Sequence, residues 1–274
     1  MTAVESPRNP RVRAAAELRD RRQRDRTGLT LVDGVREVSR AIAAGIEVVE
    51  VFVSPARLER DPEGRALAAR LAEADVPVHP ASDAALERIG FGDRAEGVIA
   101  VVRIPPLGLD RLELPADPLV VVLERVEKPG NLGAVLRSAD GAGASAVVLA
   151  DPLTDLFNPN AIRASLGTIF ALPLASAPAP AVRDYLLAAG VVPWAARVDA
   201  AALYTDAALA GPAALVLGSE AHGLSPTWDH PRVRPVRLPM LGVADSLNVS
   251  IAAAVLLYEA RRQRGPAPTP PGSP

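Results

Sequence analysis

The stretch Leu119-Val-Val-Val-Leu-Glu-Arg-Val-Glu-Lys-Pro-Gly-Asn-Leu-Gly-Ala-Val-Leu-Arg137 contains three successive patterns that indicate the fold. Five consecutive apolar residues predict a strand that is buried on both faces, as in a parallel sheet covered by helices. A polar loop with a Pro-Gly turn follows, and apolar residues at helical spacing then predict a helix over residues 132–142. Because ligands of open parallel sheets bind beyond the carboxyl ends of the strands, this loop is a candidate functional segment.

The rest of the second half repeats this organisation. Three more apolar runs predict strands at residues 146–150, 190–196 and 213–217, and helices are predicted at 160–166, 180–189 and 248–264. The resulting expectation is a parallel α/β sheet. Two further loops carry glycine and polar side chains where strands end, namely Leu217-Gly-Ser-Glu-Ala-His-Gly-Leu224 and Leu238-Pro-Met-Leu-Gly-Val-Ala-Asp-Ser-Leu-Asn-Val-Ser250.

The first hundred residues predict a smaller α/β domain. Its expected helices span 12–24, 35–44, 62–74 and 83–89, and its expected strands span 29–32, 48–53, 76–79 and 97–103. The proline-bearing stretch that follows has little periodicity and is typical of a linker. We therefore expect an N-terminal domain over residues 1–104, a linker over 105–116, a second domain over 117–264 and a disordered tail over 265–274.

Composition excludes several classes of protein. Of the 274 residues, 49% are hydrophobic and 23% are charged, which is enough to bury a core. Cysteine is absent, so disulfides, thiolate zinc sites and cysteine nucleophiles are excluded, and three scattered histidines argue against a metal site. No apolar run reaches the roughly 18–20 residues of a membrane span, and no secretory signal pattern is present. We expect a cytoplasmic protein without a membrane or metal partner.

Arginine is concentrated near the N-terminus. The net charge is −2, yet residues 1–40 hold ten arginines against six acidic residues, and eight of these arginines lie between Arg8 and Arg26. Lys128 is the only lysine of the chain. An arginine run can be a solvated helix face. It can equally be a phosphate-binding arm, because a guanidinium pairs bidentately with phosphate and stays charged.

Each of the three loops also has a purely structural interpretation. A Pro-Gly-Asn sequence before a helix can be an ordinary turn with an N-cap, and Asn248 can cap the last helix. The usual dinucleotide and P-loop sites are excluded, because no Gly-x-Gly-x-x-Gly opens a helix and no Gly-Lys-Ser/Thr closes a loop. Taken together after parallel strands, the loops favour a functional site.

The loops resemble the SpoU/TrmH branch of the SPOUT RNA methyltransferases. The resemblance covers residues 119–262 and is carried by Asn131-Leu-Gly-Ala-Val-Leu-Arg137, Gly218-Ser-Glu-Ala-His-Gly223, Leu238-Pro-Met240, Ser246-Leu-Asn-Val-Ser250 and, between them, Asn158-Pro-Asn-Ala-Ile-Arg163. The N-terminal half is similar to a ribosomal-protein-like RNA-binding domain. That likeness is carried by Leu31-Val-Asp-Gly-Val-Arg-Glu37 and Glu96-Gly-Val-Ile-Ala-Val101, with Asp33 in place of the expected Glu.

The resemblance implies methyl transfer from S-adenosylmethionine to a ribose 2′-hydroxyl of structured RNA, with 23S ribosomal RNA favoured as the substrate. It also implies a homodimer with its active sites at the interface, and a trefoil knot. Two alternatives stay open, a tRNA 2′-O-methyltransferase and a non-catalytic dimeric RNA-binding protein.

Site residues follow from the matched motifs. The resemblance assigns catalysis to Asn131, Arg137, Glu220, Ser246 and Asn248. It assigns the cofactor to Leu217, Gly218, Leu238, Met240 and Leu247. RNA contacts are expected from Arg8, Arg11, Arg13, Arg22, Arg24, Arg36 and Arg163. A guanidinium stays protonated under ordinary conditions, so stabilising a developing alkoxide is an easier role for Arg137 than acting as a base.

Overall fold

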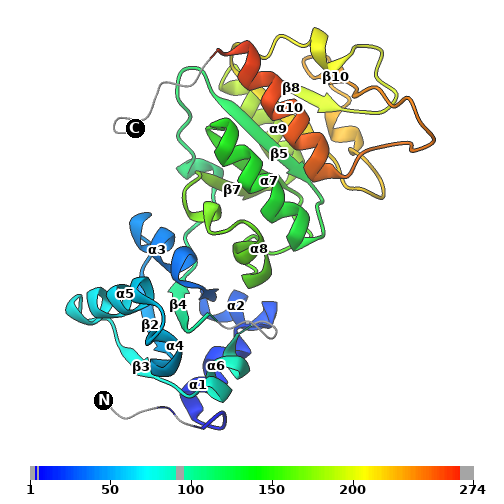
Figure 1. Cartoon of the computed structure of the whole chain (residues 1–274). Helices are drawn as coiled ribbons and strands as arrows, with labels where there is room; N and C mark the ends of the chain where they lie inside the picture. The colour runs from blue at the N-terminus through cyan, green and yellow to red at the C-terminus, as the bar shows by residue number, and fades with distance from the viewer. Residues whose placement is uncertain (1–3, 5, 91–95, 266–274) are drawn as a thin grey trace. The chain divides into compact units, whose positions relative to one another are not determined.

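The computed structural model describes residues 4, 6–90 and 96–265, which form two compact units (Figure 1). The first unit combines the described part of Met1–Pro106 with Asp155–Ala171. The second unit combines Leu107–Thr154 with the described part of Leu172–Pro274. The α/β class expected for both halves is confirmed. Except for its first residue, the expected disordered tail lies outside the described residues.

The second unit is built on a six-stranded sheet in the order β10-β8-β9-β5-β6-β7, with every neighbouring pair parallel. The strands are β5 (Leu119–Glu124), β6 (Ala146–Ala150), β7 (Leu174–Ala177), β8 (Val192–Ala196), β9 (Ala213–Leu217) and β10 (Arg234–Val236). All four strands expected from apolar runs are present. The two edge strands, β7 and β10, were not expected, because they are short and half-exposed and β10 contains a proline, which an edge strand tolerates.

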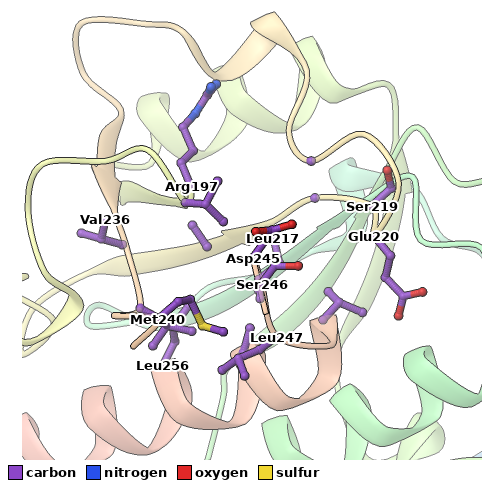
Figure 2. A pocket seen from close by; sticks show the side chains of 17 residues that line it. Arg197, Leu217, Ser219, Glu220, Val236, Met240, Asp245, Ser246, Leu247 and Leu256 are labelled. Carbon is purple, nitrogen blue, oxygen red and sulfur yellow. The ribbon is translucent and has the colours of Figure 1, made fainter. Parts of the chain in front are cut away.

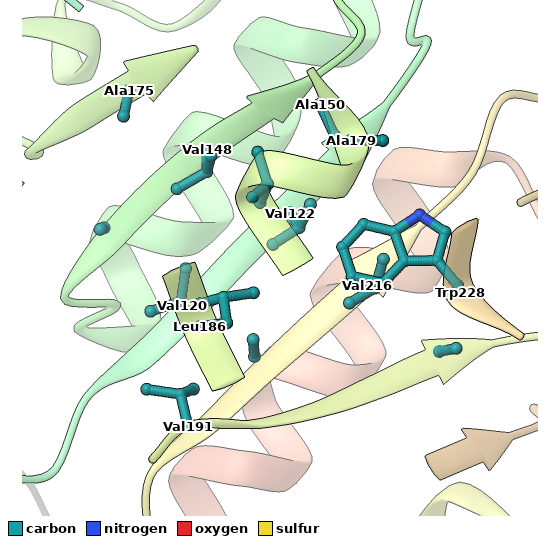
Figure 3. Close-up of a cluster of buried hydrophobic side chains, with 14 of the residues drawn as sticks. Val120, Val122, Val148, Ala150, Ala175, Ala179, Leu186, Val191, Val216 and Trp228 are labelled. Carbon is teal, nitrogen blue, oxygen red and sulfur yellow. The ribbon is translucent and has the colours of Figure 1, made fainter. Parts of the chain in front are cut away.

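Helices cover both faces of this sheet. α7 (Pro129–Ala142) and α10 (Val249–Gln263) pack side by side on one face, and α9 (Ala179–Ala188) lies on the other (Figure 1). Figure 3 shows the core on the α9 side, where Val122, Val148 and Val216 from three adjacent strands lie near Leu186 of α9. Because successive strand residues face opposite sides, unbroken apolar strands supply both cores at once.

The first unit holds a four-stranded sheet in the order β1-β4-β2-β3, in which only β2 and β3 are parallel. Its strands are β1 (Leu29–Asp33), β2 (Val48–Val53), β3 (Val78–Pro80) and β4 (Val98–Arg103). Its helices are α1 (Pro10–Glu17), α2 (Arg21–Thr27), α3 (Val35–Ala43), α4 (Pro55–Leu58), α5 (Pro62–Glu73), α6 (Asp83–Ile89) and α8 (Pro159–Ala164). The single helix expected over 12–24 is wrong. The side chain of Asp20 accepts a hydrogen bond from the Arg22 backbone and starts a new helix.

The segment Asp155–Ala171 packs with the first unit, although the sequence analysis places it in the second domain. The chain leaves the large sheet after β6 and returns to it at β7. In between, the Thr30 hydroxyl donates to the Phe157 carbonyl at 2.7 Å, and the Arg40 guanidinium donates to the Leu166 carbonyl at 2.6 Å. The segment therefore contributes α8 to the fold of the first unit.

Arg24 secures the start of this segment. Its side chain is 2% exposed, and its Nε pairs with the Asp155 carboxylate at 2.6 Å. Its Nη1 donates to the carbonyls of Leu18 and Arg19 at 2.7 and 2.9 Å. A guanidinium that is buried and hydrogen-bonded in this way is not available to a phosphate. Arg24 therefore does not fit the RNA contact expected of it and serves the fold instead.

Replacing Arg24 with Met should destabilise the protein by about 3–5 kcal/mol, because the Asp155 side chain would lose its cationic partner in a poorly hydrated place and keep only the hydrogen bond from the Phe157 backbone. Urea unfolding followed by circular dichroism measures this change. The matched control is Arg22→Met, which removes an exposed arginine of the same helix and should stay within about 0.5 kcal/mol of the wild type. Equal stability of the two variants would contradict the assignment.

Candidate active site

A cavity of about 280 Å³ lies at the carboxyl ends of β10, β8 and β9. The last residues of these three strands, Val236, Ala196 and Leu217, all line it. The three strands are adjacent and parallel, so their ends meet at one edge of the sheet. This is where open parallel sheets bind ligands.

All five residues expected to bind a cofactor line this cavity, and so do Glu220 and Ser246. Figure 2 shows Met240 and Glu220 at opposite ends of the group, with Asp245 and Ser246 between them. The complete lining is Ala196, Arg197, Val198, Leu217, Gly218, Ser219, Glu220, Gly223, Val236, Leu238, Met240, Asp245, Ser246, Leu247, Val249, Ala252 and Leu256.

The contribution of β8 to this cavity was not expected from the sequence. Arg197 follows its last residue directly and pairs with Asp229 at 2.5 Å. The apolar run at 190–196 correctly predicts this strand. Because ligands bind beyond the carboxyl ends of parallel strands, the same prediction could have identified Ala196 and Arg197 as lining residues.

Gly218 permits a tight turn on the wall of the cavity. Ser219 and Gly223 exchange two backbone hydrogen bonds at 3.2 and 3.0 Å. A Cβ at position 218 would lie 2.2 Å from the carbonyl carbon of Gly223, so only glycine fits without moving backbone. The turn places Ser219 and Glu220 beyond the end of β9.

A buried carboxylate anchors the far end of the same loop. Glu124 is the last residue of β5 and is fully buried. Its carboxylate accepts hydrogen bonds from the backbone and the hydroxyl of Ser225, at 2.7 and 2.6 Å. Glu124 was not expected among the site residues, because the sequence shows it only as the first residue of the polar loop and gives no sign of a partner 101 residues away.

Four polar side chains converge beside the cavity, and we call Lys128, Asn131, Glu220 and Asn248 the Glu220 cluster. Oε1 of Glu220 accepts from the side-chain amides of Asn131 and Asn248, the latter at 2.9 Å. Oε2 accepts from the Lys128 ammonium at 2.7 Å. Asn248 also donates to Asn131 Oδ1 at 3.3 Å, and its own Oδ1 caps α10 by accepting from the Ser250 backbone. Asn248 therefore caps α10 and also takes part in the Glu220 cluster.

The Glu220 cluster borders two cavities. A second cavity of about 140 Å³ is lined by Arg125, Val126, Glu127, Lys128, Asn131, Ser219, Glu220, Ala221 and Val249, three of which also line the first. The hydrogen bond from Lys128 lowers the pKa of Glu220 below its usual range, and the bond from Asn131 acts in the same direction. An ionised carboxylate therefore stands between the two spaces.

Arg137 is not part of this cluster. It lies on α7 six positions after Asn131, which places it on another face of the helix, and it is exposed. Among residues 4, 6–90 and 96–265, no hydrogen bond or ion pair involves its side chain. One chain thus brings together Asn131, Glu220 and Asn248, with Ser246 on the adjoining wall, and leaves the expected fifth residue apart.

The expected RNA-contacting arginines belong to the first unit. Arg8, Arg11, Arg13, Arg22 and Arg36 are exposed and Arg163 is half-buried. Arg11 pairs with Glu50 at 3.3 Å, and Arg36 pairs with Glu37 at 2.8 Å.

Two negative findings concern the described residues. No group of three His, Asp or Glu side chains among them is placed to hold a metal ion. No helix in the same part of the chain is long and apolar enough to cross a membrane.

The protein is thus of the α/β class, with a parallel sheet, a cavity at the carboxyl ends of its strands and a charged side-chain cluster beside that cavity. Residues 118–258 match the SpoU rRNA Methylase family, and residues 9–100 match the MRM3-like substrate binding domain. The chain belongs to the SpoU rRNA methylase family, as its motifs indicated.

Relatives align along most of the chain. The 23S rRNA (uridine(2479)-2′-O)-methyltransferase of Streptomyces viridochromogenes is 34% identical over 255 residues, covering 91% of this chain and 88% of that protein. The 23S rRNA (guanosine(2553)-2′-O)-methyltransferase RlmP of Bacillus subtilis is 28% identical, covering 95% of this chain and all of that protein.

Solved structures agree with this membership. A crystal structure described as an RNA 2′-O ribose methyltransferase aligns with a TM-score of 0.84 and 40% identity, covering 96% of this chain and 99% of the other. The AdoMet-bound rRNA methyltransferase of Sinorhizobium meliloti aligns with a TM-score of 0.86 and 29% identity, covering 95% and 97%.

Gly218→Ala should weaken S-adenosylmethionine binding, because the new Cβ forces the loop away from Gly223. Overpacking of this kind costs about 1–3 kcal/mol, which corresponds to about a 5- to 150-fold rise in Kd. Isothermal calorimetry measures it. Gly211→Ala, where a Cβ meets nothing within 4 Å, is the control and should bind like the wild type. Unchanged affinity in Gly218→Ala would show that the loop does not shape the cofactor site.

Proposed function

We propose that this protein methylates a ribose 2′-hydroxyl of 23S ribosomal RNA, with S-adenosylmethionine as the methyl donor. The observation that carries the proposal is the shared wall of the two cavities. Glu220 borders the cavity at the strand ends and also the second cavity, whose lining includes the charged side chains of Arg125 and Lys128. The two spaces suit a cofactor and an acceptor hydroxyl. The family, and relatives named for 2′-O-methylation of 23S rRNA, support this assignment.

S-adenosylmethionine is the cofactor, and the residues of the first cavity fit it. The volume of about 280 Å³ is close to the lower end of the usual range of ligand pockets, about 300–1,000 Å³. Leu217, Leu238 and Leu247 offer apolar walls, and Gly218 lets backbone groups approach closely. Asp245 supplies a carboxylate in reach of a cationic ligand. When bound, the cofactor supplies an electrophilic methyl group on a sulfonium.

The Glu220 cluster orients the acceptor in this proposal. Asn131 is both a donor and an acceptor, and its amide is held in one orientation by Glu220 and Asn248. Ser246 lines the cofactor cavity and can hold the neighbouring part of the ligand. Holding the hydroxyl in line with the methyl group removes much of the entropic cost of a reaction between two molecules.

Arg137 stabilises the developing alkoxide and binds a nearby phosphate, because a guanidinium keeps its charge and donates several hydrogen bonds. For this it must come close to a Glu220 cluster, and its own chain does not bring it there. We propose that a second copy of the chain supplies it, so that the enzyme works as a homodimer.

The face of α7 and α10 supports the dimer. On α10, Ile251 and Tyr258 are 53% and 55% exposed and lie seven positions apart, two helical turns along the same face. Tyr258 lies next to Gly141 of α7, the helix that also exposes Arg137. An interface over this pair of helices would bury the apolar side chains and carry Arg137 to the partner.

The remaining assignments follow the family. The first unit, whose match is a substrate-binding domain, would hold RNA through Arg8, Arg11, Arg13, Arg22, Arg36 and Arg163. We also propose the trefoil knot, since after edge strand β10 the chain returns to pack α10 beside α7. The reaction as proposed needs no metal, and the cytoplasm, where ribosomal RNA is found, is the proposed location.

Arg137→Ala should abolish methyl transfer while Kd for the cofactor stays within about twofold, because Arg137 lies outside the cofactor cavity. The measurement is transfer of labelled methyl groups from S-adenosylmethionine to protein-free 23S rRNA, with mass-spectrometric mapping of the product and calorimetry for the cofactor. Arg232→Met, an exposed arginine of the same unit, is the control. If the protein methylated tRNA and not 23S rRNA, the assignment of 23S rRNA as its substrate would be wrong. Normal turnover in Arg137→Ala would show that this residue has no role in catalysis.

A further inference from the structure

Lys128 is unusual in composition and in position. The chain contains 30 lysine and arginine residues, and Lys128 is the only lysine among them. It directly precedes the first turn of α7, and its side chain makes no capping bond to that helix. Although 70% of the side chain is exposed, its Nζ lies 2.7 Å from Oε2 of Glu220. The only ammonium side chain of the sequence therefore lies beside the carboxylate of the Glu220 cluster, whereas arginine supplies all of the other 29 basic side chains.

The two oxygens of Glu220 have different partners. Lys128 occupies Oε2, and the amides of Asn131 and Asn248 share Oε1. An ammonium is a compact point charge that can serve one oxygen and leave the other free. A guanidinium is a planar fork that takes both oxygens of a carboxylate at once. An arginine at position 128 would therefore compete with the two asparagines for Oε1.

We propose that Lys128 is a positioning residue for methyl transfer. It holds Glu220 through one oxygen and so reserves the other for Asn131 and Asn248 at the border of the two cavities. Lys128 acts through Glu220 and is not itself a catalytic residue. The proposal rests on the proposed function for its kinetic consequences, whereas the ion pair can be tested without any activity.

The charges around Glu220 give the expected pH dependence. Arg125 and Glu127 line the second cavity together with Lys128. On the other side Asp245 and Arg197 line the first cavity, and Arg197 is paired with Asp229. The hydrogen bond from Lys128 is the largest cause that lowers the pKa of Glu220.

Without Lys128 the pKa of Glu220 rises toward its ordinary value, so Glu220 takes up its proton at a higher pH as the solution is acidified. The proton occupies an acceptor oxygen of the cluster. The acid limb of the pH–rate profile must therefore move to higher pH when Lys128 is replaced by an uncharged residue.

Two substitutions separate charge from shape. Lys128→Met removes the positive charge and keeps a side chain of similar length. Lys128→Arg keeps the charge but replaces the ammonium with a planar guanidinium that can bind both carboxylate oxygens. An exposed ion pair contributes little to folding stability, so both variants should fold. Arg232→Met is the matched control for the loss of one exposed positive charge from the same unit. The substrates are protein-free 23S rRNA and labelled S-adenosylmethionine.

Lys128→Met should lower kcat about 10- to 100-fold, the usual effect of misplacing a reacting group, and should shift the acid limb upward. Lys128→Arg should also lower kcat but leave the acid limb in place. KM for the cofactor should stay constant in both variants, and Arg232→Met should match the wild type. Wild-type kcat in either Lys128 variant, or an unmoved acid limb in Lys128→Met, would overturn the proposal.

The only lysine also allows a direct test of the ion pair. Reductive methylation with ¹³C-formaldehyde labels Lys128 and the α-amino group, which titrates near 7.7–8.0 and is easily told apart. Glu220 raises the pKa of Lys128, so Glu220→Gln should lower the pKa read from the methyl resonance and leave the α-amino resonance unmoved. An identical Lys128 titration in both proteins would overturn the ion pair. Absence of RNA methylation by the wild type would instead overturn the proposed function.

Discussion

The carboxylate of Glu220 is the constraint on which the site depends. Three side-chain donors from two other segments meet on its two oxygens, Lys128 and Asn131 at the start of α7 and Asn248 at the start of α10. Asn131 and Asn248 are 117 residues apart in sequence. A hydrogen bond to an ionised group is roughly twice as strong as a neutral one, so one carboxylate can hold both helix starts against the loop after β9. The cavity at the strand ends and the second cavity both border this contact.

The sheet places Glu220 where the contact can form. β9 lies beside β5 in register, so the loops after both strands leave the same edge. Gly218 turns the chain tightly at that edge, and Glu124 holds the loop again at Ser225. A buried carboxylate with two hydrogen bonds is costly to leave unpaired, which makes Glu124 a firm anchor for a loop without regular structure.

Sequence reasoning identified the parts that depend on local pattern. The four central strands were visible as apolar runs, and the motifs that carry the resemblance named five residues that line the cavity at the strand ends. Parts that depend on distant partners were not visible. Arg24 has the same sequence context as its exposed neighbours, and only Asp155, far along the chain, makes it a buried structural residue. Arg137 is a second example. The motif assigns it to the same site as Glu220, but within one chain its side chain lies on another face of α7 and is exposed.

Activity of mixed dimers tests most directly the claim that the Glu220 cluster of one chain works with Arg137 of a second. Arg137→Ala and Glu220→Ala protomers are each expected to be inactive alone. They would be unfolded together, refolded as an equimolar mixture and assayed for methyl transfer to 23S rRNA. Half of the random dimers are then mixed, and each holds one intact site, so the mixture should recover about a quarter of wild-type activity. A mixture as inactive as its two components would contradict the account, because both residues would then have to act within one chain.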